Sequence, residues 1–280
     1  MQNHAQYFNE RAKRLVETGL LDSTLADFYT ALYGYQHREY ERFHNSSRVL
    51  SLAADGEPAD AIRNKLSEEG IMDLISPGID GLLDIMIQHH PGLALQQLRR
   101  SIREEPGAGN RYIEALLDKN FEMIEQLSQK DKTGTEETVF VLVNWLKPFF
   151  IAMREHNREL IPKGESGTDC PFCGYYADMA ALNGNENGKR HLHCSLCEHL
   201  WPFKRVACSV CGAVEAGSLE YFTIEGEEAY RIDTCNKCGG YIKTVRFDKF
   251  EDIDNLDLTV ENIITPHLDS AALRKGYRRP

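Results

Sequence analysis

Apolar residues recur at helical spacing through the first 160 or so positions of the chain. The clearest run extends from Asn110 to Leu127, where apolar positions stand three or four residues apart behind an asparagine suited to a helix cap. These positions are Ile113, Leu116, Leu117, Phe121, Ile124 and Leu127. The pattern predicts one helix over 110–127 with a single buried face.

Two more helices are predicted on either side of this run. The segment from Ser23 to Asn45 is rich in tyrosine and leucine, and Thr133-Gly-Thr-Glu136 has the pattern of a capping box ahead of another apolar stripe. That stripe consists of Val139, Leu142, Val143, Leu146, Phe149, Phe150 and Met153. Pro148 should bend or break the helix because proline removes a backbone hydrogen bond. The first half of the chain is therefore predicted to be an α-helical bundle.

The pattern changes after Ile161, where a polar, glycine-bearing segment over 161–169 is typical of a linker. Short β-prone runs follow at 221–224 and 241–247, with a turn-rich stretch at 183–188. We expect an α+β multidomain protein in which two small rubredoxin-like or zinc-ribbon β modules follow the helical bundle. The expected domains are 1–163 (helical), 164–205 and 206–250 (one four-cysteine module each) and 251–280 (a tail that packs back on the body).

Charge and hydropathy argue against a nucleic-acid-binding, membrane-spanning or secreted protein. The 280 residues carry a formal net charge of −11, and residues 170–250 hold 9 Lys and Arg against 10 Asp and Glu. Such a balance argues against a general nucleic-acid binder, which needs clustered positive charge. No apolar stretch reaches the roughly 18 residues of a membrane helix, and the N-terminal residues have no apolar run suited to a secretion signal. We expect a cytoplasmic protein that does not contact membranes.

All 8 cysteines belong to four Cys-x-x-Cys pairs, separated by 20, 10 and 23 residues. A two-residue spacing lets one tight turn present two thiolates to one metal ion, so four such turns make two all-sulfur sites. The intervals of 20 and 23 residues suit a hairpin between two turns. We therefore assign the first two Cys-x-x-Cys pairs to one metal ion and the last two pairs to another. Interleaved ligation remains an alternative. The predicted sites are Cys170, Cys173, Cys194 and Cys197, and Cys208, Cys211, Cys235 and Cys238.

Four thiolates around one ion leave no open coordination position, which argues against metal-dependent hydrolysis. The ions could be purely structural, which is the leading interpretation of the metals taken alone, or iron could transfer electrons as in a rubredoxin-like site. Thiol-redox catalysis of the thioredoxin kind would instead need a metal-free dithiol. Since the sequence contains no catalytic series, phosphate loop or zinc-protease motif, we assign no catalytic residues and expect a protein that is not an enzyme.

Basic and aromatic residues surround the second cysteine pair over 189–205. Four of them, Arg190, His193, Trp201 and Arg205, are candidates for contact with a protein partner or an anionic group. The alternative is that Trp201 and Phe203 cover the metal-binding ribbon and that the charges face water.

Together these motifs resemble the FdhE-type accessory proteins of formate dehydrogenase. The resemblance depends on Cys-Pro-Phe-Cys-Gly at 170–174, Leu-His-Cys-Ser-Leu-Cys-Glu at 192–198 with the following Trp201, the segment 205–211, and Asp-Thr-Cys-Asn-Lys-Cys-Gly at 233–239. The helical half offers no motif of its own.

The resemblance implies a helical N-terminal domain and two rubredoxin-like modules that hold two metal ions, with iron favoured by the family and zinc as the alternative. It also implies a cytoplasmic accessory protein or chaperone that binds the catalytic subunit of a molybdenum- or tungsten-dependent, often selenocysteine-containing formate dehydrogenase before assembly or export. Two other functions stay open: a zinc-ribbon protein for nucleic acid, and an electron-transfer or thiol-redox protein acting on the immature dehydrogenase. A homodimer also stays open.

Overall fold

The computed structural model describes residues 4–19, 21–46, 50–53, 56–183, 188–249 and 256–279. The chain forms two compact units, residues 1–161 and 162–280, called unit 1 and unit 2 here. Part of the turn-rich stretch at 183–188 and part of the expected C-terminal tail lie outside the described residues. No described helix combines the length and the apolar character that crossing a membrane requires.

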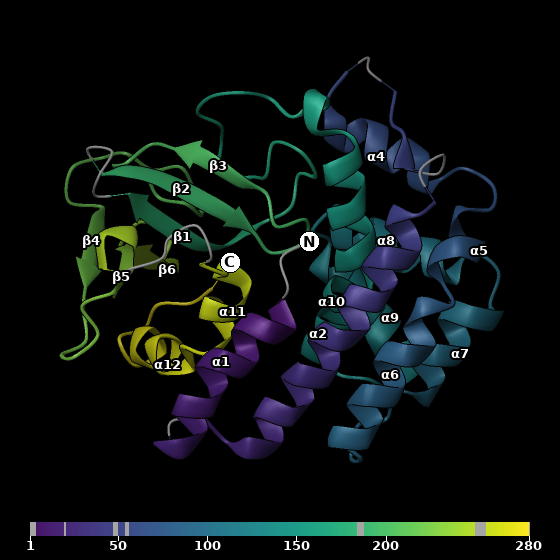
Figure 1. The fold of residues 1–280 in the computed structure, drawn as a ribbon. Coiled ribbons are helices and arrows are strands. Elements are labelled where there is room, and N and C mark those ends of the chain that lie inside the picture. Colours follow the sequence, from purple (N-terminus) through teal and green to yellow (C-terminus); the bar gives the residue numbers. More distant parts are fainter. Residues whose placement is uncertain are drawn as a thin grey trace. The chain divides into compact units, whose positions relative to one another are not determined.

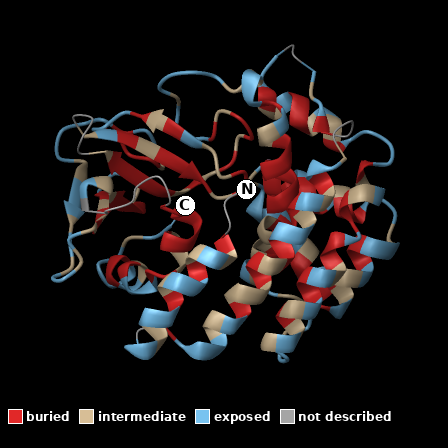
Figure 2. Cartoon of the chain, viewed as in Figure 1, coloured by how far each residue is buried: buried red, intermediate tan, exposed pale blue. Residues whose placement is uncertain are grey.

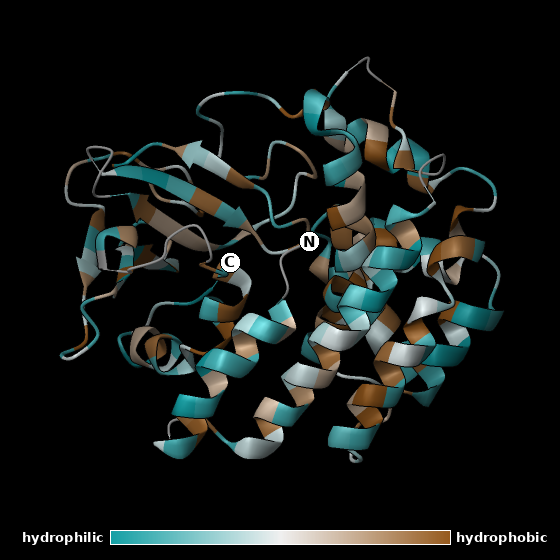
Figure 3. Ribbon diagram, viewed as in Figure 1, coloured by the Kyte–Doolittle hydropathy of each residue, from teal (hydrophilic) through white to brown (hydrophobic). Residues whose placement is uncertain are grey.

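Unit 1 is helical (Figure 1). Its α-helices are α1 (His4–Glu17), α2 (Ser23–His44), α4 (Pro58–Leu66), α5 (Ile71–Ile75), α6 (Gly78–His89), α7 (Gln96–Glu104), α8 (Ala108–Leu117), α9 (Phe121–Asp131) and α10 (Thr135–His156), and a 3-10 turn, η1, follows at Arg158–Leu160. Teal and brown residues share these helices in Figure 3, as expected for amphipathic helices that bury one face. The predicted helical half is confirmed.

Helices α2 and α10 form the centre of unit 1. The helix predicted from Ser23 is present as α2, and the carboxylate of Asp22 caps it by accepting the backbone N–H of Thr24 at 2.8 Å. Between the two helices, the rings of Phe43 and Phe149 meet edge to face with their centroids 5.2 Å apart. Unit 1 therefore has an aromatic core of its own.

Helix α10 differs from its prediction at its N-terminus. It runs through Pro148 without a break, and its N-cap is Gly134 without a side-chain cap, so the predicted capping box was wrong. The hydroxyl of Thr133 instead lies 2.9 Å from that of Thr138. The residues from Trp145 to Met153 are all buried, and this packing offsets the backbone hydrogen bond that proline removes.

The single helix predicted over 110–127 is two helices, α8 and α9. Lys119 between them takes a left-handed backbone conformation with φ of 56°, which ends α8. The side chain of Asn120 then caps α9 by accepting the backbone N–H of Met123 at 3.0 Å. Because the apolar spacing continues across this turn, periodicity alone did not reveal it.

Unit 2 is built on one six-stranded sheet with the strand order β3-β2-β1-β6-β5-β4. The strands are β1 (Ala177–Asn183), β2 (Lys189–Cys194), β3 (Leu200–Phe203), β4 (Leu219–Phe222), β5 (Tyr230–Cys235) and β6 (Tyr241–Arg246). All neighbours pair antiparallel except β1 and β6, which run parallel in the middle of the sheet. The sheet thus consists of two antiparallel three-stranded halves, β1–β3 and β4–β6. The predicted α+β architecture is confirmed.

Two short helices, α11 (Leu258–Ile263) and α12 (Pro266–Arg274), follow the sheet and pack on it. The fully buried ammonium of Lys243 on β6 holds this segment by donating to the carbonyl of Asn262 at 2.5 Å and by pairing with Asp269 at 2.8 Å. Burial lowers the pKa of Lys243 to about 8.

Within the sheet of unit 2, Figure 2 shows the buried residues, in red, concentrated in the central strands.

Candidate metal centres

The cysteine pairs lie in tight turns with a shared hydrogen-bond pattern. In the first turn, the carbonyl of Cys170 accepts the N–H of Gly174 at 2.8 Å, and the Cys170 N–H donates to the carbonyl of Tyr175 at 2.9 Å. The turns that begin at Cys208 and Cys235 repeat both bonds. The residue after the second cysteine of each of these turns is a glycine with φ between 71° and 75°. A left-handed position is easiest for glycine, so the sequence favours this turn locally.

The turn at Cys194 and Cys197 has the same geometry without the glycine. Glu198 occupies the equivalent position with φ of 58°, and its N–H donates to the carbonyl of Cys194 at 3.1 Å. Its carboxylate accepts the hydroxyl of Thr259 at 2.9 Å. A residue with a side chain is strained at this φ, and the bond to Thr259 offsets part of that strain.

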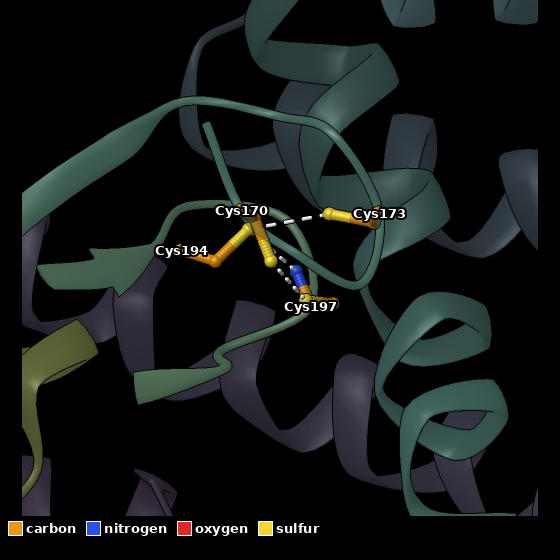
Figure 4. Close-up of side chains that lie close together, drawn as sticks. All are labelled: Cys170, Cys173, Cys194 and Cys197. Atoms are coloured by element: carbon orange, nitrogen blue, oxygen red, sulfur yellow. Dashed lines mark hydrogen bonds between the residues drawn. The ribbon is translucent and has the colours of Figure 1, made fainter. Parts of the chain in front are cut away.

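Cluster I consists of Cys170, Cys173, Cys194 and Cys197, whose side chains converge in Figure 4. Two come from the turn before β1, and two from the end of β2 and the turn that follows. The sulfurs of Cys170 and Cys197 are 3.6 Å apart, and those of Cys173 and Cys194 are 3.4 Å apart. All four residues are buried. The first half of the sheet thus presents four sulfurs to one point.

Cluster II repeats the arrangement in the second half of the sheet with Cys208, Cys211, Cys235 and Cys238. The sulfurs of Cys208 and Cys238 are 3.8 Å apart, and those of Cys211 and Cys235 are 3.9 Å apart. No cysteine of one cluster belongs to the other, so the ligand sets are sequential rather than interleaved.

Both clusters fit a tetrahedrally coordinated metal ion. Four sulfurs about 2.3 Å from one ion stand about 3.8 Å from each other. The sulfur pairs described above are 3.4 to 3.9 Å apart. Backbone N–H groups also point at the sulfurs: Leu196 donates to Cys194 at 3.4 Å, and Gly240 donates to Cys238 at 3.3 Å. The two clusters can therefore hold two metal ions, and their sulfur donors suit zinc and iron alike.

Without a metal, ionising Cys173 and Cys197 of cluster I would be costly. Burial raises the pKa of the Cys173 and Cys197 thiols well above the ordinary range. A bound cation would favour the thiolate forms because it takes the place of the thiol protons. Metal binding and the folding of the two cysteine turns of cluster I are therefore coupled.

The structure places the four residues predicted to contact a partner in different environments. Trp201 on β3 is fully buried, and its indole N–H donates to the carbonyl of Gly167 at 3.1 Å. Arg190 and His193 are also buried, while Arg205 is exposed. Of these four side chains, therefore, only that of Arg205 lies on the exposed surface of unit 2.

Arg190 and His193 make polar contacts inside unit 2. Arg190 donates to the carbonyl of Ala207 at 2.8 Å and forms an ion pair with Asp233, with 3.2 Å between Nη2 and Oδ2. The Nδ1 atom of His193 lies 2.8 Å from the carboxylate of Asp178. Asp178 was missed as a partner at the sequence level, and Asp233 was noted only as part of a motif, since neither is near its partner in sequence.

Comparison with known proteins bears on the first cluster most directly. Residues 169–205, which include all of cluster I, match the family model described as FdhE, central domain. A protein FdhE homolog of Edwardsiella ictaluri is 35% identical over 118 residues, and protein FdhE of Escherichia coli O9:H4 is 32% identical over 118 residues. The predicted resemblance to FdhE is confirmed.

The sequence similarity to FdhE covers only part of each protein. The matched segment spans 41% of this chain and 37% of these curated FdhE relatives. The crystal structure of FdhE from Pseudomonas aeruginosa extends the likeness in fold: the TM-score is 0.61 at 22% identity, covering 100% of this chain and 95% of that one. The fold of that structure is thus shared along the chain, whereas the sequence matches to the two FdhE relatives named above each cover 118 residues.

Proposed function

We propose that this protein is an accessory protein for the maturation of formate dehydrogenase, which binds the catalytic subunit in the cytoplasm before assembly or export and catalyses no reaction itself. The observation that carries the proposal is the pair of closed four-cysteine clusters on one sheet, in a chain with the central domain of FdhE. Four sulfur ligands leave no position for a substrate, which supports a binding role rather than a hydrolytic one.

The metal would be held by the eight cysteines of clusters I and II, with iron favoured and zinc as the alternative. Bound metal supplies metal–sulfur bonds that stabilise the turns, and iron would add a one-electron redox couple. The chain's own contribution is the orientation of the sulfurs by the turns and the N–H groups described above.

Exposed apolar side chains near cluster II support a protein partner. Val206 and Tyr221 are 67% and 63% exposed, and Val214 is also exposed. Large apolar residues at a surface are candidates for burial by another protein. We propose that the catalytic subunit covers this part of unit 2.

The test is capture of an apo formate dehydrogenase catalytic subunit by the metal-loaded chain under anaerobic conditions. The wild-type chain should retain the subunit, and replacing Val206 and Tyr221 by aspartate should lower retention by about tenfold or more. The matched control replaces Phe121, an exposed apolar residue of unit 1, by aspartate and should leave capture unchanged. Absence of capture by the correctly folded, metal-loaded wild type would refute the proposal.

One observation favours the redox alternative, in which the protein transfers electrons to the immature dehydrogenase. Cys211 of cluster II is exposed to solvent, and an accessible metal–sulfur site exchanges electrons more readily than a buried one. Anaerobic purification followed by an iron assay and a redox titration tests this role. A reversible iron couple whose oxidation is driven by the apo subunit would favour it, and bound zinc without a chromophore would exclude it.

A further inference from the structure

The two clusters differ in how far solvent reaches their sulfur ligands. Every cysteine of cluster I is at most 4% exposed. In cluster II, Cys208 and Cys235 are buried, Cys238 is partly exposed, and Cys211 is exposed. A ligand from solution can therefore approach cluster II without any opening of the fold, whereas cluster I is sealed.

The Cys211 sulfur also lacks the backbone support that the Cys208 and Cys238 sulfurs have. The sulfur of Cys208 accepts the N–H groups of Val210 and Cys211 at 3.3 and 3.4 Å, and that of Cys238 accepts the N–H of Gly240 at 3.3 Å. Within the described residues, the Cys211 sulfur accepts no backbone N–H; its close neighbour is the Cys235 sulfur, 3.9 Å away. Because N–H donors stabilise thiolate charge and Cys211 is also the exposed cysteine of this cluster, Cys211 is the ligand best placed to leave.

A cleft also lies beside cluster II. This cleft of about 250 Å³ is lined by Cys208 and Cys235 together with Val210, Tyr221 and Arg231. The apolar cluster beside these sulfurs is small, with Cys208, Ala213 and Cys235 as its buried members. Local rearrangement at cluster II therefore disturbs few buried contacts.

We propose that cluster II is a metal-exchange site at which a low-molecular-weight thiol displaces Cys211, while cluster I retains its ion as part of the fold. The step is a ligand substitution: a bond forms between the metal and the sulfur of the incoming thiol, and the bond to the Cys211 sulfur breaks. The proton lost by the incoming thiol passes to the released Cys211 thiolate, and no oxidation state changes.

The decisive experiment uses the wild-type full-length chain loaded with two zinc ions. The chain is mixed with an excess of a chelating dye and increasing concentrations of 2-mercaptoethanol, and zinc release is followed by absorbance. One equivalent should leave about tenfold or more faster than the other, because its site needs no opening of the fold. The rate of the fast phase should rise in proportion to the thiol concentration.

Alkylation assigns the fast phase to a cluster. Iodoacetamide added after that phase should label peptides carrying the cysteines of cluster II and spare those of cluster I, as read by mass spectrometry. Equal release rates, a fast phase independent of thiol, or first labelling of cluster I would each overturn the proposal. A Cys211→Ala chain should keep one slowly released ion at the wild-type slow rate, and an accelerated slow phase in a folded variant would also contradict it.

Discussion

The guanidinium of Arg190 on β2 pairs with the carboxylate of Asp233 on β5, and so joins the strand that ends in cluster I to the strand that ends in cluster II. Both partners are shielded from solvent, with side chains 3% and 14% exposed. Asp233 also accepts the hydroxyl of Thr244 at 2.6 Å and lies 2.8 Å from Nε of Arg231. The two halves of the sheet therefore share a buried polar connection in addition to their backbone pairing.

Replacing Arg190 by glutamine should lower the free energy of unfolding of unit 2 by about 3 kcal/mol, because Asp233 loses a buried partner and the Ala207 carbonyl loses its donor. Urea denaturation of the metal-loaded chain, followed by tryptophan fluorescence, measures the change. The control is Arg246→Gln, which breaks the more exposed pair with Asp248 and should cost less than about 1 kcal/mol. Equal effects of the two substitutions would contradict the role given to Arg190.

The buried Lys243 predicts a pH dependence of stability. Its pKa in the folded chain is lowered to about 8 from the ordinary lysine value of 10.5, so between these values the unfolded chain binds more protons than the folded one. The contribution of Lys243 to stability must then rise as the pH increases from 8 towards 10, by at most about 1.4 kcal/mol per pH unit.

The measurement compares wild type with Lys243→Met at pH 7, 8, 9 and about 9.5 by chemical denaturation. The difference in unfolding free energy should move in favour of the wild type as the pH rises above 8, because methionine does not titrate. A difference that stays flat, or that moves in favour of methionine, would show that the folded pKa of Lys243 is not lowered.

Glu198 gives a prediction about backbone strain. At its φ of 58°, glycine is relaxed and valine is a steric outlier. Glu198→Gly should change stability by less than about 1 kcal/mol, because relief of strain offsets loss of the hydrogen bond to Thr259. Glu198→Val should cost about 2 kcal/mol or more. Thr259→Val removes the hydrogen bond alone and provides the control, and equal stability of the glycine and valine variants would refute the argument.

Removal of both metals should affect the two units differently. Unit 1 has its own aromatic core, whereas the turns of unit 2 carry cysteines that a bound metal ion would hold together. In a chelator with mild denaturant, the helical circular dichroism signal should persist while limited proteolysis cuts within residues 162–280. Cuts that appear first between α2 and α10 would contradict this expectation.

The sequence predicted what depends on local spacing. Helical periodicity identified α2 and α10, and the spacing of the cysteines indicated two all-sulfur sites. It did not reveal the turn at Lys119, because the apolar spacing continues across it, nor the persistence of α10 through Pro148, which depends on tertiary packing. The ion pair between Arg190 and Asp233 could not be predicted from the sequence either, since residues far apart in sequence meet only after the strands have paired.

The parallel pairing of β1 with β6 has a consequence for synthesis of the chain on the ribosome. Met179 on β1 pairs with Lys243 on β6, so the first half of the sheet is fully translated while one side of β1 still lacks its neighbour. An open edge of this kind is a template for aggregation. The nascent chain can therefore aggregate through this edge of β1 until β6 has left the ribosome. Rapid folding of β4–β6 around a metal ion would shorten the time for which the edge is unpaired.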